Sequence, residues 1–130
     1  MKKGFSLIET VIVLSIIGIL FAFISYQLSS FGDQARFKAV TRMIVSDLRL
    51  CQQNAITQKE SCEIVFGTNN YKTDSKVKQL PPLITIQNPQ TIRFASSGNP
   101  CPGYFGTIIL TLKKQTAKII ISSFGRIRVE

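Results

Sequence analysis

Apolar residues dominate one long stretch near the start of the chain. Residues 5–26 contain a single charged residue, Glu9. A helix rises about 1.5 Å per residue, so a helix of this length can cross the hydrocarbon core of a membrane, which is about 30 Å thick. Lys2 and Lys3 precede the stretch, and the positive-inside tendency leaves the N-terminus in the cytoplasm. No A-x-A site follows the apolar stretch, which argues against a secretory signal that is cleaved there.

A second pattern follows, in which apolar residues recur every three or four positions. This spacing forms a single stripe along a helix, with the charged residues off the stripe. The stripe comprises Phe37, Val40, Ile44, Leu48, Cys51 and Ala55. No proline interrupts residues 5–59, so we expect one continuous helix of roughly 55 residues. Two helices broken near residues 29–32 are the alternative. The second half, residues 29–59, is expected to pack its stripe on a globular head.

From residue 60 the pattern changes to short runs separated by turn residues, which indicates β-strands. The expected strands are 62–66, 83–86, 91–95, 106–112, 117–122 and 126–130, and 71–77 is a charged strand or loop. Alternation puts two groups of apolar residues on different faces. They are Ile108, Leu110 and Leu112 on one, and Ile119 with Ile121 on another. The predicted fold class is α+β: a long N-terminal helix, transmembrane in its first half, packed on a small antiparallel β head formed by residues 60–130.

The composition excludes most kinds of enzymatic site. The 130 residues include no histidine, so Ser-His-Asp and Cys-His nucleophilic sites, histidine bases and histidine-bound zinc are all excluded. The three cysteines form no C-x-x-C pair and are too few for an all-cysteine zinc site. We therefore expect no enzyme, no metal or other cofactor, and no small-molecule substrate.

The three cysteines, Cys51, Cys62 and Cys101, allow one disulfide in three ways. Cys51 lies on the inward stripe of the helix, where a free cysteine behaves as a small hydrophobic residue. The expected disulfide is therefore Cys62–Cys101, with three unpaired thiols as the alternative.

Basic residues outnumber acidic residues by sixteen to seven, which gives a net charge of +9. The excess is largest near the C-terminus, where Glu130 is the only acidic residue after Asp74. Such a head attracts polyanions by counterion release. Nucleic acid, anionic lipid headgroups and acidic neighbouring subunits are all attracted by the same field.

The last expected strand carries alternating arginines. Ile127 and Val129 are expected to point inward, while Arg126 and Arg128 share the outer face about 6–7 Å apart. Two guanidinium groups at this spacing suit successive phosphates of one nucleic acid strand. Gly125 supplies the turn before the strand. A solvated charged face on an edge strand, which discourages aggregation, is the alternative.

Other residues around this strand extend the candidate site. Lys113 and Lys114, in the adjacent hairpin turn, and Lys118 are further candidates for DNA contact. The nearby aromatic residues are candidates for stacking on single-stranded bases, although packing in the core or in loops is the expected role of each. They are Tyr104, Phe105 and Phe124. The sequence holds no recognition helix or zinc module, so any DNA binding is expected to be non-specific.

The N-terminal residues resemble the start of type IV pilins and pseudopilins. The resemblance rests on Lys2-Lys3-Gly4-Phe5, on Glu9 four residues after Phe5, and on the apolar helix that follows. It implies that a prepilin peptidase removes a leader, residues 1–4, by cutting between Gly4 and Phe5, and methylates Phe5. Residues 5–28 then form the helix of the membrane and the filament core. Many family members have proline where this chain has Tyr26.

Glu9 is an unusual residue for an apolar helix, because a carboxylate in a membrane is costly unless it finds a partner. A buried Glu9 neutralised by the α-amino group of a neighbouring subunit would set the register of a filament. An acid tolerated near the helix end is the alternative.

Residues 29–130 resemble the FimT/GspH-like minor pilins. The matching parts are the glycine-rich approach to residues 106–110, the strand 118–121 and the terminal Gly125-Arg126-Ile127-Arg128. In competence-associated members a terminal G-R-x-R is associated with DNA contact, so the resemblance implies that role for Gly125, Arg126 and Arg128. Members in type II secretion are structural subunits near the tip of a pseudopilus.

These observations predict a minor type IV pilin that assembles into a pilus and binds DNA non-specifically for uptake in natural transformation. The expected partners are the prepilin peptidase, other pilins, DNA and, before assembly, the inner membrane, which the chain crosses once. A structural pseudopilin of a type II secretion system is the alternative. A membrane-anchored enzyme or adhesin is a third class, for which the sequence offers no catalytic constellation.

Overall fold

The computed structural model describes residues 6–74 and 76–130, apart from the side chains of residues 25–30. The chain divides into two compact units, Met1–Arg36 and Phe37–Glu130. The cleavage and methylation positions expected from the sequence, Gly4 and Phe5, lie outside the described residues.

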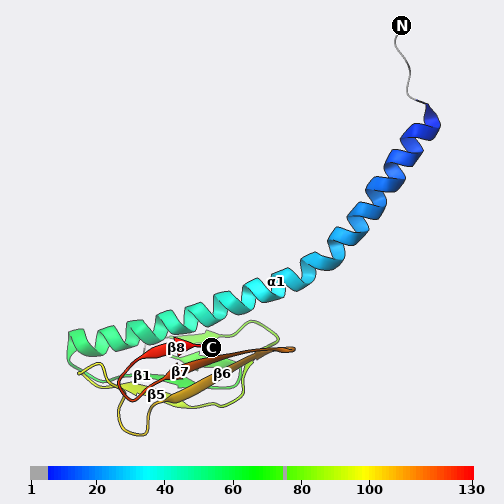
Figure 1. The fold of residues 1–130 in the computed structure, drawn as a ribbon. Coiled ribbons are helices and arrows are strands. Elements are labelled where there is room, and N and C mark those ends of the chain that lie inside the picture. Colours follow the sequence, from blue (N-terminus) through cyan, green and yellow to red (C-terminus); the bar gives the residue numbers. More distant parts are fainter. Residues whose placement is uncertain (1–5, 75) are drawn as a thin grey trace. The chain divides into compact units, whose positions relative to one another are not determined.

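One continuous helix, α1 (Leu7–Gln58), runs from the first unit into the second (Figure 1). The prediction of a single helix is confirmed, and the alternative break near residues 29–32 is wrong. Lys59 ends the helix by adopting the left-handed conformation, with φ 56°. Among the described residues, Leu7–Ile24 is the one segment long and apolar enough to cross a membrane, judged by length and composition. Its mean hydropathy is 2.7 and none of it is buried.

The β head contains two four-stranded antiparallel sheets (Figure 1). The first has the order β3 (Val77–Gln79), β2 (Asn70–Lys72), β1 (Cys62–Phe66), β5 (Thr91–Phe94). The second has the order β4 (Ile84–Ile86), β6 (Gly106–Leu112), β7 (Gln115–Ile121), β8 (Ile127–Val129). The predicted α+β class with an antiparallel head is confirmed. The segment predicted as one strand or loop, 71–77, instead contributes to the two strands of the β2–β3 hairpin.

The core of the head forms between the apolar stripe of α1 and the inward faces of the strands. All six predicted stripe residues are buried. The two apolar groups expected on different faces share one face, because Ile108 lies directly opposite Ile119 and Leu110 lies opposite Ala117. Alternation within each strand was predicted correctly, but the pairing register places both inward sets in the same core.

A disulfide joins Cys51, near the end of α1, to Cys62, the first residue of β1. The two Cα atoms are 5.6 Å apart, and both residues are buried. Cys101 is a free, half-buried cysteine. The expected Cys62–Cys101 pair is therefore wrong. The prediction treated the inward position of Cys51 as a reason for a free thiol, whereas Cys51 is both a core residue and a partner in the disulfide.

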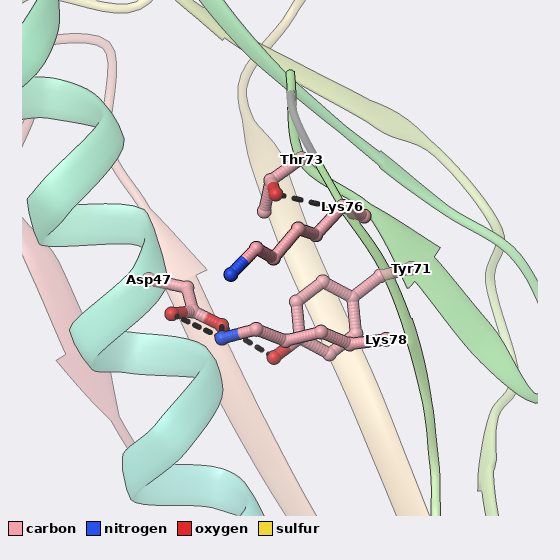
Figure 2. A network of polar contacts seen from close by, with 5 residues as sticks. All are labelled: Asp47, Tyr71, Thr73, Lys76 and Lys78. Carbon is pink, nitrogen blue, oxygen red and sulfur yellow. Dashed lines mark hydrogen bonds and ion pairs between the residues drawn. The ribbon is translucent and has the colours of Figure 1, made fainter.

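A polar network ties the β2–β3 hairpin to α1 (Figure 2). The Tyr71 hydroxyl donates to Asp47 Oδ2 at 2.5 Å, and Lys78 Nζ donates to both carboxylate oxygens of Asp47 at 2.8 and 2.9 Å. Figure 2 shows the Lys76 side chain also extending toward the helix. Burial raises the pKa of the Tyr71 phenol, and the hydrogen bond to Asp47 and its negative charge raise it further.

The raised pKa of Tyr71 predicts that the head loses stability in alkaline solution. Above about pH 10 the phenol ionises in the unfolded chain but stays protonated in the folded chain. The unfolded state then binds fewer protons, so the free energy of unfolding falls with rising pH, by up to about 1.4 kcal/mol per pH unit from this group. Urea titrations of the full chain in a non-ionic detergent, between about pH 9 and pH 11, measure this slope.

Tyr71→Phe is expected to flatten that slope, at a cost of about 1 kcal/mol in stability near neutral pH for the lost hydrogen bond. Tyr104→Phe replaces a partly exposed tyrosine and is the matched control, with the wild-type slope expected. An unchanged slope in Tyr71→Phe would contradict the prediction.

Candidate nucleic-acid interface

The arginines of the last strand lie on an exposed face. Strand β8 pairs antiparallel with β7, with Arg128 directly opposite Ile120 and Ile127 opposite Ile121. Ile121 is buried and Ile127 packs against the core, so Arg126 and Arg128 alternate to the other face, where both are exposed. Val129 was expected to point inward. It lies opposite buried Ile119 but is 49% exposed, because β8 is an end strand of its sheet.

Lys118 lies on the same face as the two arginines, because it alternates with the buried residues Ala117 and Ile119 along β7. Its backbone exchanges two hydrogen bonds with Glu130, at 2.7 and 2.8 Å. Glu130 is therefore opposite Lys118 and on the arginine face. The acid was not part of the predicted site, and its charge lowers the positive potential between Arg128 and the lysines beyond.

Lys113 and Lys114 lie at the other end of β7 from the arginines. They form the turn of the β6–β7 hairpin, which Leu112 and Gln115 close, and both are exposed. At the opposite end of β7, the amide of Ser122 donates a hydrogen bond to the carbonyl of Arg126. The seven residues of β7 span about 24 Å, so the predicted basic residues form a line along β7 and β8 and not a compact cluster. We call this line the basic track: Arg126, Arg128, Lys118, Lys113 and Lys114.

The turn before β8 is held by a helix residue that sequence reasoning missed. Gln52 Nε2 donates to the carbonyl oxygens of Gly98, at 2.7 Å, and Gly125, at 3.1 Å. The Gly125 amide donates to the Ser122 carbonyl at 3.0 Å. A Cβ on Gly125 would lie 2.7 Å from both Gln52 Nε2 and the Gly98 carbonyl oxygen. Gly125 therefore positions the strand, and it offers no side chain to a ligand.

The three aromatic residues considered for stacking differ in exposure. Phe124 is 85% exposed, Phe105 45% and Tyr104 37%. Loop or core packing was expected for each, and this expectation is wrong for Phe124. Arg93 stacks on Tyr104, 4.9 Å from the ring centre, and pairs with Glu63 at 2.5 Å. The hydrogen bond and charge of Glu63 raise the pKa of Arg93, so this guanidinium is already engaged.

Glu9 lies in the first turn of α1, in the first unit, and its side chain is exposed. A carboxylate at this position interacts favourably with the positive end of the helix dipole. The expected partner of Glu9 belongs to a neighbouring subunit, so its role in assembly stays a prediction. Within residues 6–74 and 76–130, no three histidine, cysteine or acidic side chains gather as metal ligands.

Comparisons with known proteins agree with this architecture. Residues 1–25 match the family described as the prokaryotic N-terminal methylation motif. The competence protein ComGD of Bacillus subtilis (strain 168) is 30% identical over 71 residues, which make up 55% of this chain and 50% of ComGD. The chain thus spans about half the length of this curated relative.

The fold is similar to that of FimU, a type IV minor pilin of Pseudomonas aeruginosa, in two crystal forms. In one the TM-score is 0.65 at 13% identity, covering 77% of this chain and 92% of FimU. In the other the TM-score is 0.57 at 14% identity, covering 75% and 91%. The chain thus combines the N-terminal methylation motif with partial similarity to ComGD, and its fold is similar to that of the minor pilin FimU.

Proposed function

We propose that this chain is a minor pilin or pseudopilin that binds DNA non-specifically through the basic track, as one step of DNA uptake. The observation that carries the proposal is that Arg126, Arg128 and Lys118 lie on one exposed face of the second sheet, at its end strand β8 and the neighbouring strand β7. All three side chains are exposed on this face, so a phosphate backbone can follow them. The name of the similar ComGD, a competence protein, is compatible with this role.

The mechanism follows from the chemistry of the side chains. Each guanidinium presents several N–H donors in a planar fork, which suits a phosphate with two acceptor oxygens. Contacts of this kind fix position on the DNA backbone but carry no base information, so the binding is non-specific. Release of counterions from the DNA supplies most of the free energy, and the affinity therefore falls steeply with salt.

A salt titration of duplex DNA binding by the full chain in a non-ionic detergent tests the proposal. Arg126→Gln/Arg128→Gln is expected to weaken binding about tenfold at 0.1 M salt and to lower the slope of log affinity against log salt by about 2. Lys72→Gln/Lys76→Gln removes the same charge from exposed positions at the β2–β3 hairpin and is the matched control. It is expected to weaken binding much less.

Two outcomes would contradict the proposal. Equal weakening by both double variants would mean that the general positive charge of the head binds DNA, and not the basic track. No binding near physiological salt would favour a structural subunit of a secretion pseudopilus, a role with which Glu130 on the arginine face is also compatible. Circular dichroism of each variant checks that the head remains folded.

We further propose that the prepilin peptidase cuts between Gly4 and Phe5 and methylates Phe5, with the N-terminus on the cytoplasmic side before cleavage. The match of residues 1–25 to the methylation motif supports this step. The intact mass of the protein purified from membranes is expected to lack residues 1–4 and to include one added methyl group. Retention of all four residues in cells that have the peptidase would contradict the assignment.

A further inference from the structure

We propose that Phe124 is a stacking platform for an unpaired base, so that the end of the head next to Arg126 binds single-stranded DNA in preference to duplex. This inference rests on the proposed binding of DNA by the basic track. It names the form of nucleic acid that the site recognises.

Phe124 has the exposure that a stacking residue needs. It is 85% exposed, the largest value among the exposed large apolar side chains of the described residues. Single exposed apolar residues are common on proteins and by themselves need no explanation. Phe124 differs because it comes two residues before Arg126, at the start of the basic track, so that the ring and a phosphate-binding group are close in the chain.

The backbone that carries the ring is held on both sides. The Gly125 amide donates to the Ser122 carbonyl at 3.0 Å, and the Arg126 amide donates to Ser122 Oγ at 3.1 Å. Ser122 in turn donates its amide to the Arg126 carbonyl at 3.0 Å. Gln52 fixes the Gly125 carbonyl from the helix. The backbone on either side of Phe124 is therefore ordered before binding, so less conformational freedom is lost there on binding, which favours affinity.

A second aromatic residue lies at the same end of the sheet. Gly106, at the start of β6, pairs with Ile121 at the end of β7, so the preceding residue, Phe105, enters the sheet near the Ser122–Gly125 turn. Phe105 is 45% exposed. Aromatic rings beside a basic groove are the usual means by which proteins bind single strands without reading their sequence.

The preference for single strands follows from which base faces are free. In a duplex, each base is covered above and below by its neighbours, and a stacking side chain gains contact only where a base is unpaired. The phosphates are available in both forms. Arg126 and Arg128 therefore contribute to binding of either form, whereas Phe124 contributes to binding of the single strand.

The chain has no tryptophan, so Phe124→Trp introduces a unique fluorescent indole at the platform. Titration of the full-length variant in non-ionic detergent with a single-stranded thymidine oligonucleotide of about 15 nucleotides is expected to quench this fluorescence. Val77→Trp is the matched control, since Val77 is exposed on β3 between Lys76 and Lys78 and meets the same general attraction of DNA. Little quenching is expected there.

Phe124→Ala tests how much the ring contributes to the affinity for each form of DNA. We expect single-strand binding to weaken about fivefold or more and duplex binding to weaken less than about twofold. Phe124→Trp is expected to retain or exceed the wild-type affinity for the single strand. Arg126→Gln/Arg128→Gln is expected to weaken both forms.

The outcomes separate this inference from the function on which it rests. Absence of quenching at position 124, unchanged single-strand affinity in Phe124→Ala, or wild-type binding of duplex at least as tight as of single strand would each overturn the stacking role. If the arginine variant still weakens both forms, the proposed function stands without it. If the wild-type chain binds neither form, both proposals are wrong.

Discussion

Removing the disulfide is expected to lower the free energy of unfolding of the head by about 3 kcal/mol. The bond closes a short loop, since Cys51 and Cys62 are separated by 11 residues, and a loop of this size restricts the unfolded chain by about that amount. Cys51→Ala/Cys62→Ala removes the bond with only a small loss of buried volume. Urea titrations of the full chain in detergent, for the variant and for the wild type with and without reductant, measure the effect.

Cys101→Ala is the control for this prediction. Cys101 is free and half-buried, so its replacement is expected to change stability by less than about 1 kcal/mol. Reductant should destabilise Cys101→Ala as much as it destabilises the wild type, because the bond remains. A large loss of stability in Cys101→Ala, together with insensitivity of that variant to reductant, would contradict the Cys51–Cys62 bond and show that Cys101 takes part in the disulfide, with Cys51 or Cys62 as its partner.

The disulfide also bears on the candidate interface. Cys51 precedes Gln52, the residue that donates to both Gly98 and Gly125. The last turns of α1 are thus fixed to β1 by a covalent bond next to the position from which Gln52 holds the turn before β8. We infer that the basic track depends on the end of the helix for its placement, although its own residues all come from β6–β8 and their turns.

The elements that the sequence predicted best are those whose burial imposes a period. The stripe from Phe37 to Ala55 repeats every three or four residues because one side of α1 faces the core, and all its members are buried. Strands β1 and β6 begin and end as predicted from the runs between turn residues, at 62–66 and 106–112. The stripe and the strand runs can each be recognised within one segment of the sequence, without knowledge of its neighbours in the fold.

The features that the sequence did not predict depend on pairs of distant segments. Alternation separates the residues on the two sides of one strand, but it does not show which residues of a neighbouring strand lie on the same side of the sheet. The register, in which Ile108 lies opposite Ile119, shows that both residues face the core. The choice of Cys51 as the partner of Cys62 depends in the same way on the connection between α1 and β1. The contact of Gln52 with Gly125 joins residues 73 positions apart.

The candidate site contains features that one strand determines and features that depend on the pairing of strands. The shared face of Arg126 and Arg128 is a property of one strand, and it was predicted. The linear arrangement with Lys113 and Lys114, and the position of Glu130 opposite Lys118, follow from the pairing of β7 with its neighbours. The exposure of Phe124 was missed because it lies in a turn, where alternation carries no information.

Gly125→Ala is expected to destabilise the head by about 2 kcal/mol or more, and to weaken DNA binding although it changes no charge. Gly125 has a φ of 76°, a conformation that costs alanine about 1–2 kcal/mol. The added Cβ would also lie 2.7 Å from the Gly98 carbonyl oxygen, and this atom belongs to the backbone and cannot move aside easily. Relief of the contact shifts the turn that carries Phe124 and leads into Arg126.

Gly103→Ala separates the cost of the positive φ from the cost of the close contact. Gly103 has nearly the same φ, 83°, but no atom lies within 4 Å of the position that its Cβ would take. Its replacement is expected to cost about 1 kcal/mol and to leave DNA binding unchanged. Urea titrations and salt titrations of DNA binding on both variants measure the difference, which reports the close approach of Gly125 to Gly98 and Gln52. Equal losses of stability, with equal DNA affinity, would mean that the turn conformation alone explains the glycine and that the packed turn does not position the arginines.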